Sequence, residues 1–361
     1  MDVLIVYSNS GRGLQKDAQI LEAVLRGLGH QCRQVQLPPT PLWRSHLSIY
    51  RFKVLKRYCP GAITKLVYRS QVALLRILKP GKRADLVIHL ENVRVTQLAV
   101  GRHHWLIPNQ EWFIESRLPY LNFINRILCK THHAVSIFSA LHPDTQYLGF
   151  TGGEINTQNG SKKKDYRLAL HVAGNSQFKG TQSVLSCWQR HPEWPKLILV
   201  SQHLEPTSCS ASNIEIKPTL TSNELIALWA QAGFAILPSE VEGYGQTLAE
   251  SMGNGCITIT TDAAPMNELV EEDRGFLAEV ERKLTFRLGT RYFVSEQALE
   301  RSIQTAIDQQ PDSLENMSGL AIEWYLTNHE QFLSRLEHQL NGLVAPPLDQ
   351  SAQELPERWT R

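Results

Sequence analysis

Short apolar runs and stretches of helical spacing alternate from the start of the chain. Residues 3–7 form one apolar run and residues 34–37 form another, while apolar positions in residues 17–28 repeat at helical intervals before Gly29. A short apolar run bounded by turn residues is typical of a buried strand. The order strand, helix, strand predicts the beginning of a parallel sheet.

The same alternation continues through the chain. The predicted strands are residues 85–92, a stretch from 105 and another from 128 in the first half, and residues 168–173, 197–201, 214–216, 234–237 and 257–260 in the second. The predicted helices of the second half are residues 181–189, 223–231, 246–253, 295–309 and 313–340. Strands that alternate with helices in this way favour parallel α/β sheets.

The length of 361 residues suits two domains, each able to bury its own core. A polar, glycine-bearing and charged stretch at residues 151–166 is predicted to link them. We therefore expect an N-terminal domain at residues 1–150 and a C-terminal domain at residues 167–325. The tail, residues 344–361, contains three prolines and is predicted to pack weakly.

Composition places the chain among ordinary soluble proteins, with 42% hydrophobic and 20% charged residues. No apolar run approaches the roughly 18–20 residues of a membrane span, and the chain begins with a predicted strand in place of a signal peptide. Its six cysteines are scattered without a Cys-x-x-Cys pair, which predicts reduced thiols without a disulfide framework or zinc site. We expect a cytoplasmic protein, with peripheral attachment to the inner face of the membrane as an alternative.

The net charge of +2 hides a strong segregation. Residues 23–84 contain thirteen Lys or Arg and no Asp or Glu, so the other residues carry a net charge of −11, which is +2 less 13. A segment of one sign predicts that the N-terminal half faces a polyanion.

Part of this basic segment has helical spacing. In residues 63–78 the apolar positions 63, 66, 67, 74 and 78 share one side of a helix, and Lys65, Arg69 and Arg76 share another. An amphipathic cationic helix suits an anionic bilayer, and it also suits nucleic acid, where phosphate contacts dominate affinity. The alternative is a solvated basic helix that covers the edge of the sheet.

The most informative stretch follows the strand predicted at residues 234–237. Two glycines bracket Tyr244, and helical spacing begins at about Gly245. A strand, a glycine-rich turn and a helix N-terminus form a site for an anion, because free backbone N–H groups point outward there. Glu242 and Glu250 are eight residues apart, so we expect them roughly 10 Å or more apart. That separation exceeds the ~5 Å carboxylate pair of retaining glycoside hydrolases, and the two glutamates are expected to hold different ends of one long ligand.

The run from Glu242 to Glu250 resembles the E-x7-E signature of retaining glycosyltransferases with the GT-B fold, family 4 type. The resemblance implies two Rossmann-like domains facing across a cleft, with a last helix at residues 326–343 that crosses back onto the N-terminal domain. It also implies transfer of a sugar from a nucleotide diphosphate donor with retention and without a bound metal or cofactor. The implied catalytic residues are Glu242, Lys179 and His89. The implied donor-binding residues are Gly174, Asn175, Lys179, Gly243, Tyr244, Gly245, Gln246, Thr247 and Glu250.

One loop departs from the family pattern. Residues 171–181 resemble the donor diphosphate loop, in which an arginine and a Lys-Gly pair hold the two phosphates, and Lys179-Gly180 is retained. Asn175 and Ser176 stand where the arginine is expected. Either another cation, such as Arg12, supplies the missing charge or the affinity for the donor is low.

Candidate residues of the N-terminal domain lie in three places. Gly11, Arg12 and Gly13 resemble the family loop beside the acceptor and the donor phosphates, with an ordinary turn as the alternative. His89 ends a strand and matches the family histidine beside the transferred sugar, with a structural histidine as the alternative. The predicted acceptor pocket contains Asn109, Gln110 and Glu111. Paired histidines at 103–104 and 132–133 predict no metal site, because neighbouring residues of a strand point to opposite faces.

The sequence therefore predicts a retaining glycosyltransferase that uses a UDP- or GDP-linked sugar. The acceptor is expected to be anionic or presented on an anionic surface, and glycosylation of modified bases in DNA is one alternative. A non-catalytic nucleotide-sugar-binding protein, a phosphorylase and an epimerase are alternatives of other classes. The basic segment, residues 23–84, is the predicted contact with an anionic membrane or nucleic acid.

Overall fold

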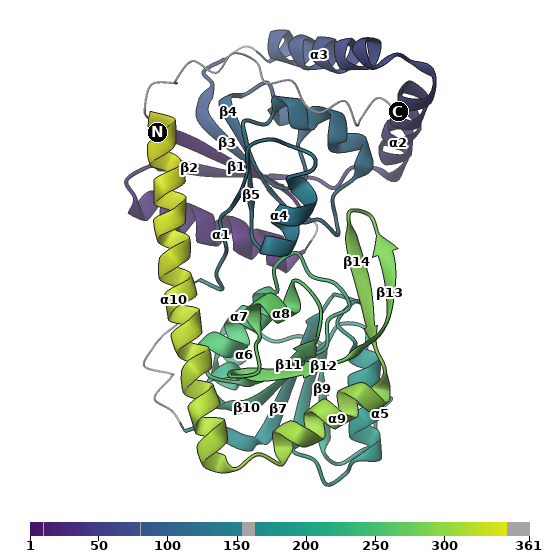
Figure 1. Ribbon diagram of the computed structural model, residues 1–361, viewed down its shortest axis with the longest axis vertical. Coiled ribbons are helices and arrows are strands. Elements are labelled where there is room, and N and C mark those ends of the chain that lie inside the picture. The colour runs from purple at the N-terminus through teal and green to yellow at the C-terminus, as the bar shows by residue number, and fades with distance from the viewer. Residues whose placement is uncertain (10, 80, 154–162, 345–361) are drawn as a thin grey trace. The chain divides into compact units, whose positions relative to one another are not determined.

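A computed structural model describes residues 1–9, 11–79, 81–153 and 163–344. Contacts divide the chain into two compact units. Among the described residues, unit 1 contains Met1–Gly149 and residues 333–344, and unit 2 lies between Phe150 and Phe332. Figure 1 shows the helices and strands of the two units.

Unit 1 is built on a six-stranded parallel sheet with the order β2-β1-β3-β4-β5-β6. Its strands are β1 (Asp2–Ser8), β2 (Gln31–Leu37), β3 (Ala84–Glu91), β4 (Gly101–Pro108), β5 (Arg126–Cys129) and β6 (Thr145–Tyr147). Its helices are α1 (Arg12–Gly27), α2 (Leu42–Tyr58), α3 (Gly61–Leu78) and α4 (His132–Phe138), with short 3₁₀ turns η1 (Val95–Gln97) and η2 (Glu115–Phe123). The apolar runs predicted as strands β1, β2 and β3 are confirmed.

Two features of unit 1 differ from the sequence-based expectation. Helix α1 begins at Arg12, directly after Gly11 with φ of 152°, so Arg12 and Gly13 belong to its first turn and not to a loop. The helix starts early because Leu14, Asp17 and Ala18 are buried against the unit. Helix α2 was not predicted as a separate helix, since its apolar residues occupy two faces and give no single periodicity.

Unit 2 contains a second six-stranded parallel sheet, with the order β12-β11-β10-β7-β8-β9. Its strands are β7 (Asp165–Gly174), β8 (Lys196–Ser201), β9 (Ile214–Lys217), β10 (Ala232–Leu237), β11 (Ile257–Thr261) and β12 (Gly275–Ala278). Its helices are α5 (Thr181–Arg190), α6 (Ser222–Gln231), α7 (Gln246–Gly253), α8 (Met266–Leu269) and α9 (Glu296–Ile307), with one 3₁₀ turn, η3 (Pro206–Ser208). The strands and helices predicted for this half are confirmed to within a few residues at each end. Their apolar faces meet in one core that includes Trp188, Phe234 and Leu299.

In each sheet the order of the strands reverses once. In unit 1, β2 lies on one side of β1 and β3 lies on the other. In unit 2, β8 lies on one side of β7 and β10 lies on the other. A reversal of this kind leaves a crevice outside the carboxyl ends of the two neighbouring strands, where α/β sheets bind ligands. The topology therefore marks the loops after β7 and β10 in unit 2, and those after β1 and β3 in unit 1.

A two-stranded antiparallel hairpin stands apart from both parallel sheets. It consists of β13 (Val280–Phe286) and β14 (Gly289–Val294), joined through Arg287 in the left-handed region with φ of 56°. The sequence did not predict this hairpin, because most side chains of β13 are exposed and the run carries little apolar signal.

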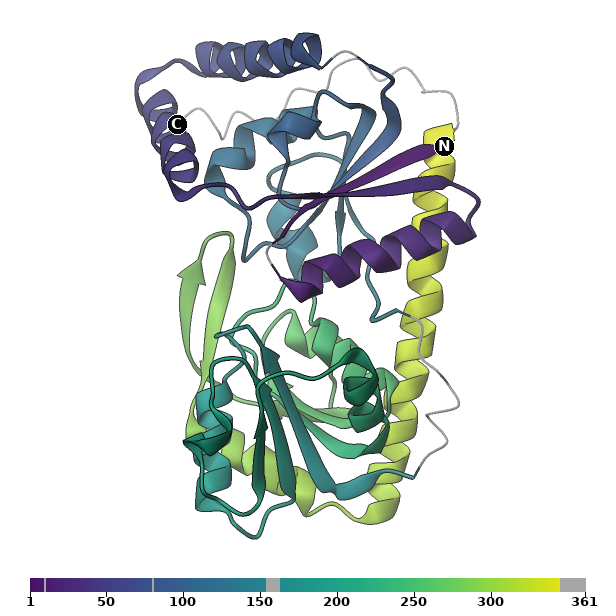
Figure 2. The same cartoon turned by 180° about the vertical axis from the view of Figure 1, so that it is seen from behind.

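The final helix, α10 (Pro311–Val344), is 34 residues long. Leu314, Ala321 and Tyr325 are buried in unit 2, and Leu336 and Leu340 are buried in unit 1. Figure 2 shows this helix as one continuous ribbon. Strand β7 begins at Asp165, inside the stretch predicted as a linker. Within that stretch, residues 154–162 lie outside the described part of the chain, as does the predicted tail beyond Val344.

Candidate functional site

The loops after β7 and β10 meet at the point where the order of the strands reverses in unit 2. The amide of Glu240 donates a hydrogen bond of 2.8 Å to the carbonyl of Phe178, which joins the two loops directly. Phe178 precedes Lys179, and Glu240 lies two residues before Glu242. The fold therefore brings together two predicted site residues that are 63 positions apart in the sequence.

Lys179 is the centre of this arrangement. Its ammonium group contacts the carboxylate of Glu242 and donates to the hydroxyl of Thr247 at 3.3 Å. The same carboxylate oxygen of Glu242 accepts a hydrogen bond of 2.7 Å from Ser239. Only 13% of each of the Lys179 and Glu242 side chains is exposed, so the pair is largely removed from solvent. An ammonium group has three donors, and the two contacts above use two of them.

Two glycines permit the close approach of these loops. Gly180 has φ of 67°, and a Cβ at this position would lie 2.4 Å from the carbonyl oxygen of Pro238. Gly245 has φ of 107°, and a Cβ there would lie 2.8 Å from the side chain of Leu248. Left-handed backbone disfavours residues other than glycine, and both positions also lack room for a side chain.

The N-terminus of α7 opens at this site. Gly245 is its N-cap and provides no side-chain hydrogen bond to the first turn. At the first helical position, both polar side-chain atoms of Gln246 are buried and have no hydrogen-bond partner among the described residues. A helix N-terminus without a side-chain cap and a buried amide side chain without a partner favour a ligand with several hydrogen-bonding oxygens.

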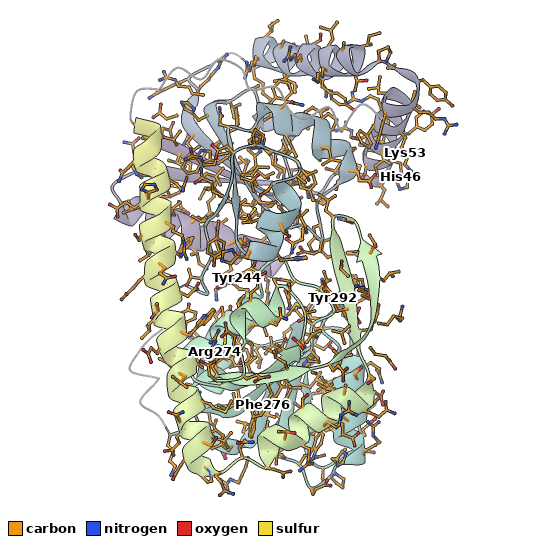
Figure 3. The ribbon with its side chains drawn as sticks, in the orientation of Figure 1. His46, Lys53, Tyr244, Arg274, Phe276 and Tyr292 are labelled. Carbon is orange, nitrogen blue, oxygen red and sulfur yellow. The ribbon has the colours of Figure 1, made fainter. Side chains whose placement is uncertain are left out.

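Tyr244 and Glu250 also contact other parts of unit 2 (Tyr244 is labelled in Figure 3). The Tyr244 hydroxyl donates to the carbonyl of Phe150 at 2.7 Å and accepts from Asn328 at 3.2 Å, and only 6% of the residue is exposed. Its ring therefore holds the turn in place. Glu250 lies beside Tyr325, and desolvation together with the charge of Glu250 raises the pKa of Tyr325 to about 12.

The loop that departs from the family pattern carries no charge at the expected positions. Gly174 is left-handed with φ of 56°, and Asn175 is exposed, with its carbonyl 3.2 Å from a ring nitrogen of His203. The hydroxyl of Ser176 accepts from the amide of Phe178 at 3.2 Å. Asn175 and Ser176 thus shape the turn before Lys179.

Sequence reasoning missed the contribution of the β13–β14 hairpin. Arg291 of β14 forms an ion pair with Glu240, and its guanidinium lies 4.7 Å from the ring centre of Phe178. The amide of Tyr292 donates to the carbonyl of Glu240 at 2.7 Å. The hairpin therefore braces both loops. Arg291 and Glu240 are 51 positions apart in sequence, and no local sequence pattern predicts such a contact.

His171 lies beneath the site. Its Nδ1–H donates to the carbonyl of Ile236 at 2.6 Å, so its Nε2 accepts from the hydroxyl of Thr181 at 2.9 Å. Desolvation, with a smaller contribution from the charge of Lys179, lowers the pKa of His171 to about 4. The imidazole is therefore neutral near pH 7.

The predicted N-domain residue His89 is enclosed in unit 1. It is fully buried, its Nδ1 accepts from the amide of Arg94 at 3.0 Å, and its Nε2 lies 3.1 Å from Nδ1 of His104. Desolvation lowers the pKa of His89 well below its usual value and lowers the pKa of His104 to about 4. With both ring nitrogens engaged, the geometry favours the structural role for His89 over the catalytic one.

The other predicted N-domain residues lie at the rim of the sheet in unit 1. Gly11, Arg12 and Gly13 are exposed. Asn109 accepts a hydrogen bond of 3.1 Å from Lys130, which also pairs with buried Asp17. Gln110 and Glu111 are buried, with 1% and 4% of each residue exposed.

No helix among the described residues is long and apolar enough to cross a membrane. No group of three or more His, Cys, Asp or Glu side chains within the described ranges is arranged to hold a metal ion.

Residues 158–310 match the family model described as Glycosyl transferases group 1. Comparison with curated protein sequences gives no match. Among solved structures, the chain is similar to sucrose-phosphate synthase from Thermosynechococcus elongatus, with a TM-score of 0.66, 13% identity, and coverage of 95% of this chain and 99% of that one.

Two further solved structures have the same fold. HepE from Anabaena, in complex with UDP and glucose, gives a TM-score of 0.61 at 14% identity, with 96% of this chain and 100% of that one covered. WaaG, a glycosyltransferase involved in lipopolysaccharide biosynthesis, gives 0.57 at 16% identity, with 95% and 100% covered. Residues 158–310 therefore resemble the glycosyl transferases group 1 family, and the chain as a whole has the GT-B fold with two Rossmann-like domains.

Proposed function

We propose that this chain is a retaining glycosyltransferase that moves a sugar from a UDP- or GDP-linked donor to an acceptor that is anionic or presented on an anionic surface. The observation that carries the proposal is the contact of Lys179 with Glu242 and Thr247 beside the N-terminus of α7. A cation, open helix amides and a carboxylate at one point suit a diphosphate joined to a polyhydroxyl group.

Each residue then has an assigned role. Lys179 and the amides of residues 243–246 hold the diphosphate, Glu242 accepts hydrogen bonds from hydroxyls of the sugar, and Glu250 holds the ribose. The solved structure of HepE contains UDP and glucose, which supports a ligand of this class. His89 is left out of the reacting groups because its ring is enclosed.

The reaction needs no protein nucleophile. The bond between the anomeric carbon and the diphosphate oxygen breaks, and the acceptor oxygen forms a new bond to that carbon on the same face. The acceptor proton passes to the departing diphosphate. Lys179 and the N-terminus of α7 stabilise the negative charge that develops on the leaving group, and they do so in a site that is largely removed from water.

Substitution of the two charged residues tests the proposal. We expect Lys179→Ala and Glu242→Ala each to reduce release of the nucleoside diphosphate from the sugar donor by at least about a hundredfold, because each removes a charged contact to the reacting ligand. The control is Lys196→Ala with Glu215→Ala, a lysine–glutamate pair of the same unit with 54% and 38% of the side chains exposed. Near-normal turnover in either site variant would contradict the assignment.

A non-catalytic nucleotide-sugar-binding protein is the second candidate, and the neutral residues Asn175 and Ser176 favour it. Both candidates predict that UDP or GDP raises the melting temperature, because a ligand that binds the folded state stabilises it. Only the transferase releases the nucleoside diphosphate from a radiolabelled donor and delivers the sugar to a product. Donor binding without release would therefore favour the binding protein.

A further inference from the structure

Helices α2 and α3 present an apolar surface that the core of unit 1 does not use. Ten of the thirteen exposed large hydrophobic side chains in the described part of the chain lie on these two helices. They are Leu42, Trp43, Leu47, Tyr50, Tyr58, Ile63, Leu66, Leu74, Ile77 and Leu78. We call this set the α2–α3 apolar face.

Each helix packs on unit 1 through a side other than the one that carries its exposed apolar residues. The buried side chains are Phe52 on α2 and Tyr68 and Val72 on α3. Arg51 of α2 donates to Gln71 of α3 at 2.9 Å and to Tyr120 at 2.8 Å, which ties the two helices to each other and to η2. The helices are therefore anchored, and their exposed apolar residues are held in fixed positions.

The exposed residues follow helical periodicity. Trp43, Leu47, Tyr50 and Tyr58 are spaced by four, three and eight positions, so they share one side of α2. On α3, Ile63, Leu66, Leu74 and Ile77 repeat in the same way, with exposed fractions of 49%, 62%, 55% and 74%. The side of residues 63–78 predicted to be apolar from sequence is thus the side that faces outward.

The same two helices carry many cations, and those of α3 lie on a different side from its exposed apolar residues. Seven exposed Lys or Arg residues lie on α2 and α3, and neither helix contains an acidic residue. They are Arg44, Lys53, Lys56, Arg57, Lys65, Arg69 and Arg76. No salt bridge within the described ranges involves any of the seven. Figure 3 labels Lys53 and the neighbouring His46 on α2.

We propose that the α2–α3 apolar face docks on an anionic lipid bilayer, with its leucine and isoleucine side chains in the acyl boundary and its cations at the headgroups. Transfer of aliphatic side chains from water into a bilayer interior is favourable. Tryptophan and tyrosine favour the level of the headgroups. Nucleic acid would bind the cations and stack on the aromatic residues, but it would leave Leu66, Leu74 and Ile77 in water. A second copy of the chain would bring seven cations against seven.

The surface lies on one side of unit 1. In Figures 1 and 2, which view the chain from opposite directions, α3 lies at the edge of unit 1 opposite α1. The docking proposal does not depend on transferase activity, since it concerns helices that carry none of the residues assigned to the donor. Its test therefore uses binding alone.

The first experiment is co-sedimentation of the full chain with vesicles of phosphatidylcholine, with and without about a third of phosphatidylglycerol. We expect binding to the anionic vesicles and little to the neutral ones. The double variant Leu66→Ser and Ile77→Ser is expected to weaken partitioning roughly tenfold, because two exposed side chains no longer enter the bilayer. The matched control is Ile226→Ser with Leu284→Ser, both 49% exposed in unit 2, and it should bind like the wild type.

Salt separates the two contributions. Raising the ionic strength from about 0.1 M to about 0.5 M screens the cations, so binding should fall but remain above that of the Leu66→Ser and Ile77→Ser variant. Quenching by brominated lipid should be lost on Trp43→Phe, since Trp43 is 63% exposed on the docking face.

Three outcomes would overturn the proposal. The first is equal or absent binding to anionic and neutral vesicles. The second is binding of a DNA duplex, without vesicle binding, that the Leu66→Ser and Ile77→Ser variant retains. The third is a dimer in sedimentation velocity that the same variant dissociates, without vesicle binding.

Discussion

At the scale of single residues, burial decides what the titratable side chains can do. His171 and His89 are both fully buried and have both ring nitrogens engaged, although one lies in each unit. The ring nitrogens of each histidine bond to groups inside the protein, so each histidine acts as a neutral, structural imidazole. Lys179 and Glu242 retain a partly exposed contact, which is what a group that meets a ligand requires.

The buried histidine of unit 2 predicts a dependence of stability on pH. The pKa of His171 is about 4 in the folded state and about 6.5 in an unfolded chain. Above pH ~6.5 both states are neutral, and between ~6.5 and ~4 the unfolded state alone binds the proton. The free energy of unfolding should therefore fall as the pH falls through this range, by at most about 1.4 kcal/mol per pH unit for this residue.

Urea unfolding at pH 7 and pH 4.5 measures this loss. In the variant His171→Gln, which cannot titrate, the difference between the two pH values should be smaller than in the wild type by roughly 1–3 kcal/mol. His89 and His104 stay in both proteins and cancel in the comparison. An unchanged difference would mean that His171 titrates near its usual pKa.

At the scale of elements, the β13–β14 hairpin determines how the two loops of the site are held. Arg291 and the amide of Tyr292 both bind Glu240, which in turn donates its amide to Phe178. The loop residues next to Lys179 and Glu242 are thus clamped from outside the parallel sheet. A loop fixed in this way keeps its charged groups in place before a ligand arrives.

Removal of the clamp should destabilise unit 2. We expect Arg291→Ala to lower the free energy of unfolding by about 1–3 kcal/mol, because it leaves the carboxylate of Glu240 partly buried without its cation. Amide hydrogen exchange should also become faster at Tyr292, whose N–H binds Glu240. Arg282→Ala is the control, since Arg282 lies on the same hairpin and stacks 3.9 Å from the ring centre of Phe293. Equal effects of the two substitutions would contradict a specific role for Arg291.

At the scale of the whole molecule, helix α10 is a structural part of both units. Its C-terminal section is held in unit 1 by Arg335, which donates to the carbonyl of Leu148 at 2.8 Å, and by Gln339, which binds Arg126 and Gln146. Unit 1 is therefore built from two segments of the chain that are far apart in sequence.

Truncation of a buried residue in this section should affect unit 1 selectively. We expect Leu336→Ala to lower stability by about 2–5 kcal/mol, since Leu336 is completely buried and its loss leaves a cavity. Hydrogen exchange should accelerate in β5 and β6 and change little in the sheet of unit 2. Glu337→Ala, at the exposed neighbouring position, should have almost no effect. Uniform loss of protection in both sheets would show that the two units unfold together.

Local sequence was enough to predict most strands of the two parallel sheets, their alternation with helices and the close turn between Glu242 and Glu250. These features are local, because a strand that is buried on both faces must be apolar and a close turn must carry glycine. The absence of the family's arginine was also evident from the sequence, because Asn175 stands at that position.

Features that depend on partners distant in sequence could be read from the folded chain alone. Periodicity identified the apolar side of residues 63–78 but could not tell which side the core would cover, because α3 has a second set of apolar residues in Tyr68 and Val72. His89 contacts His104 of the neighbouring strand, a residue 15 positions away in sequence. Lys179 contacts Glu242 because the strand order of unit 2 reverses between β7 and β10. The order of strands in a sheet depends on contacts between distant segments, so no local run of residues predicts it.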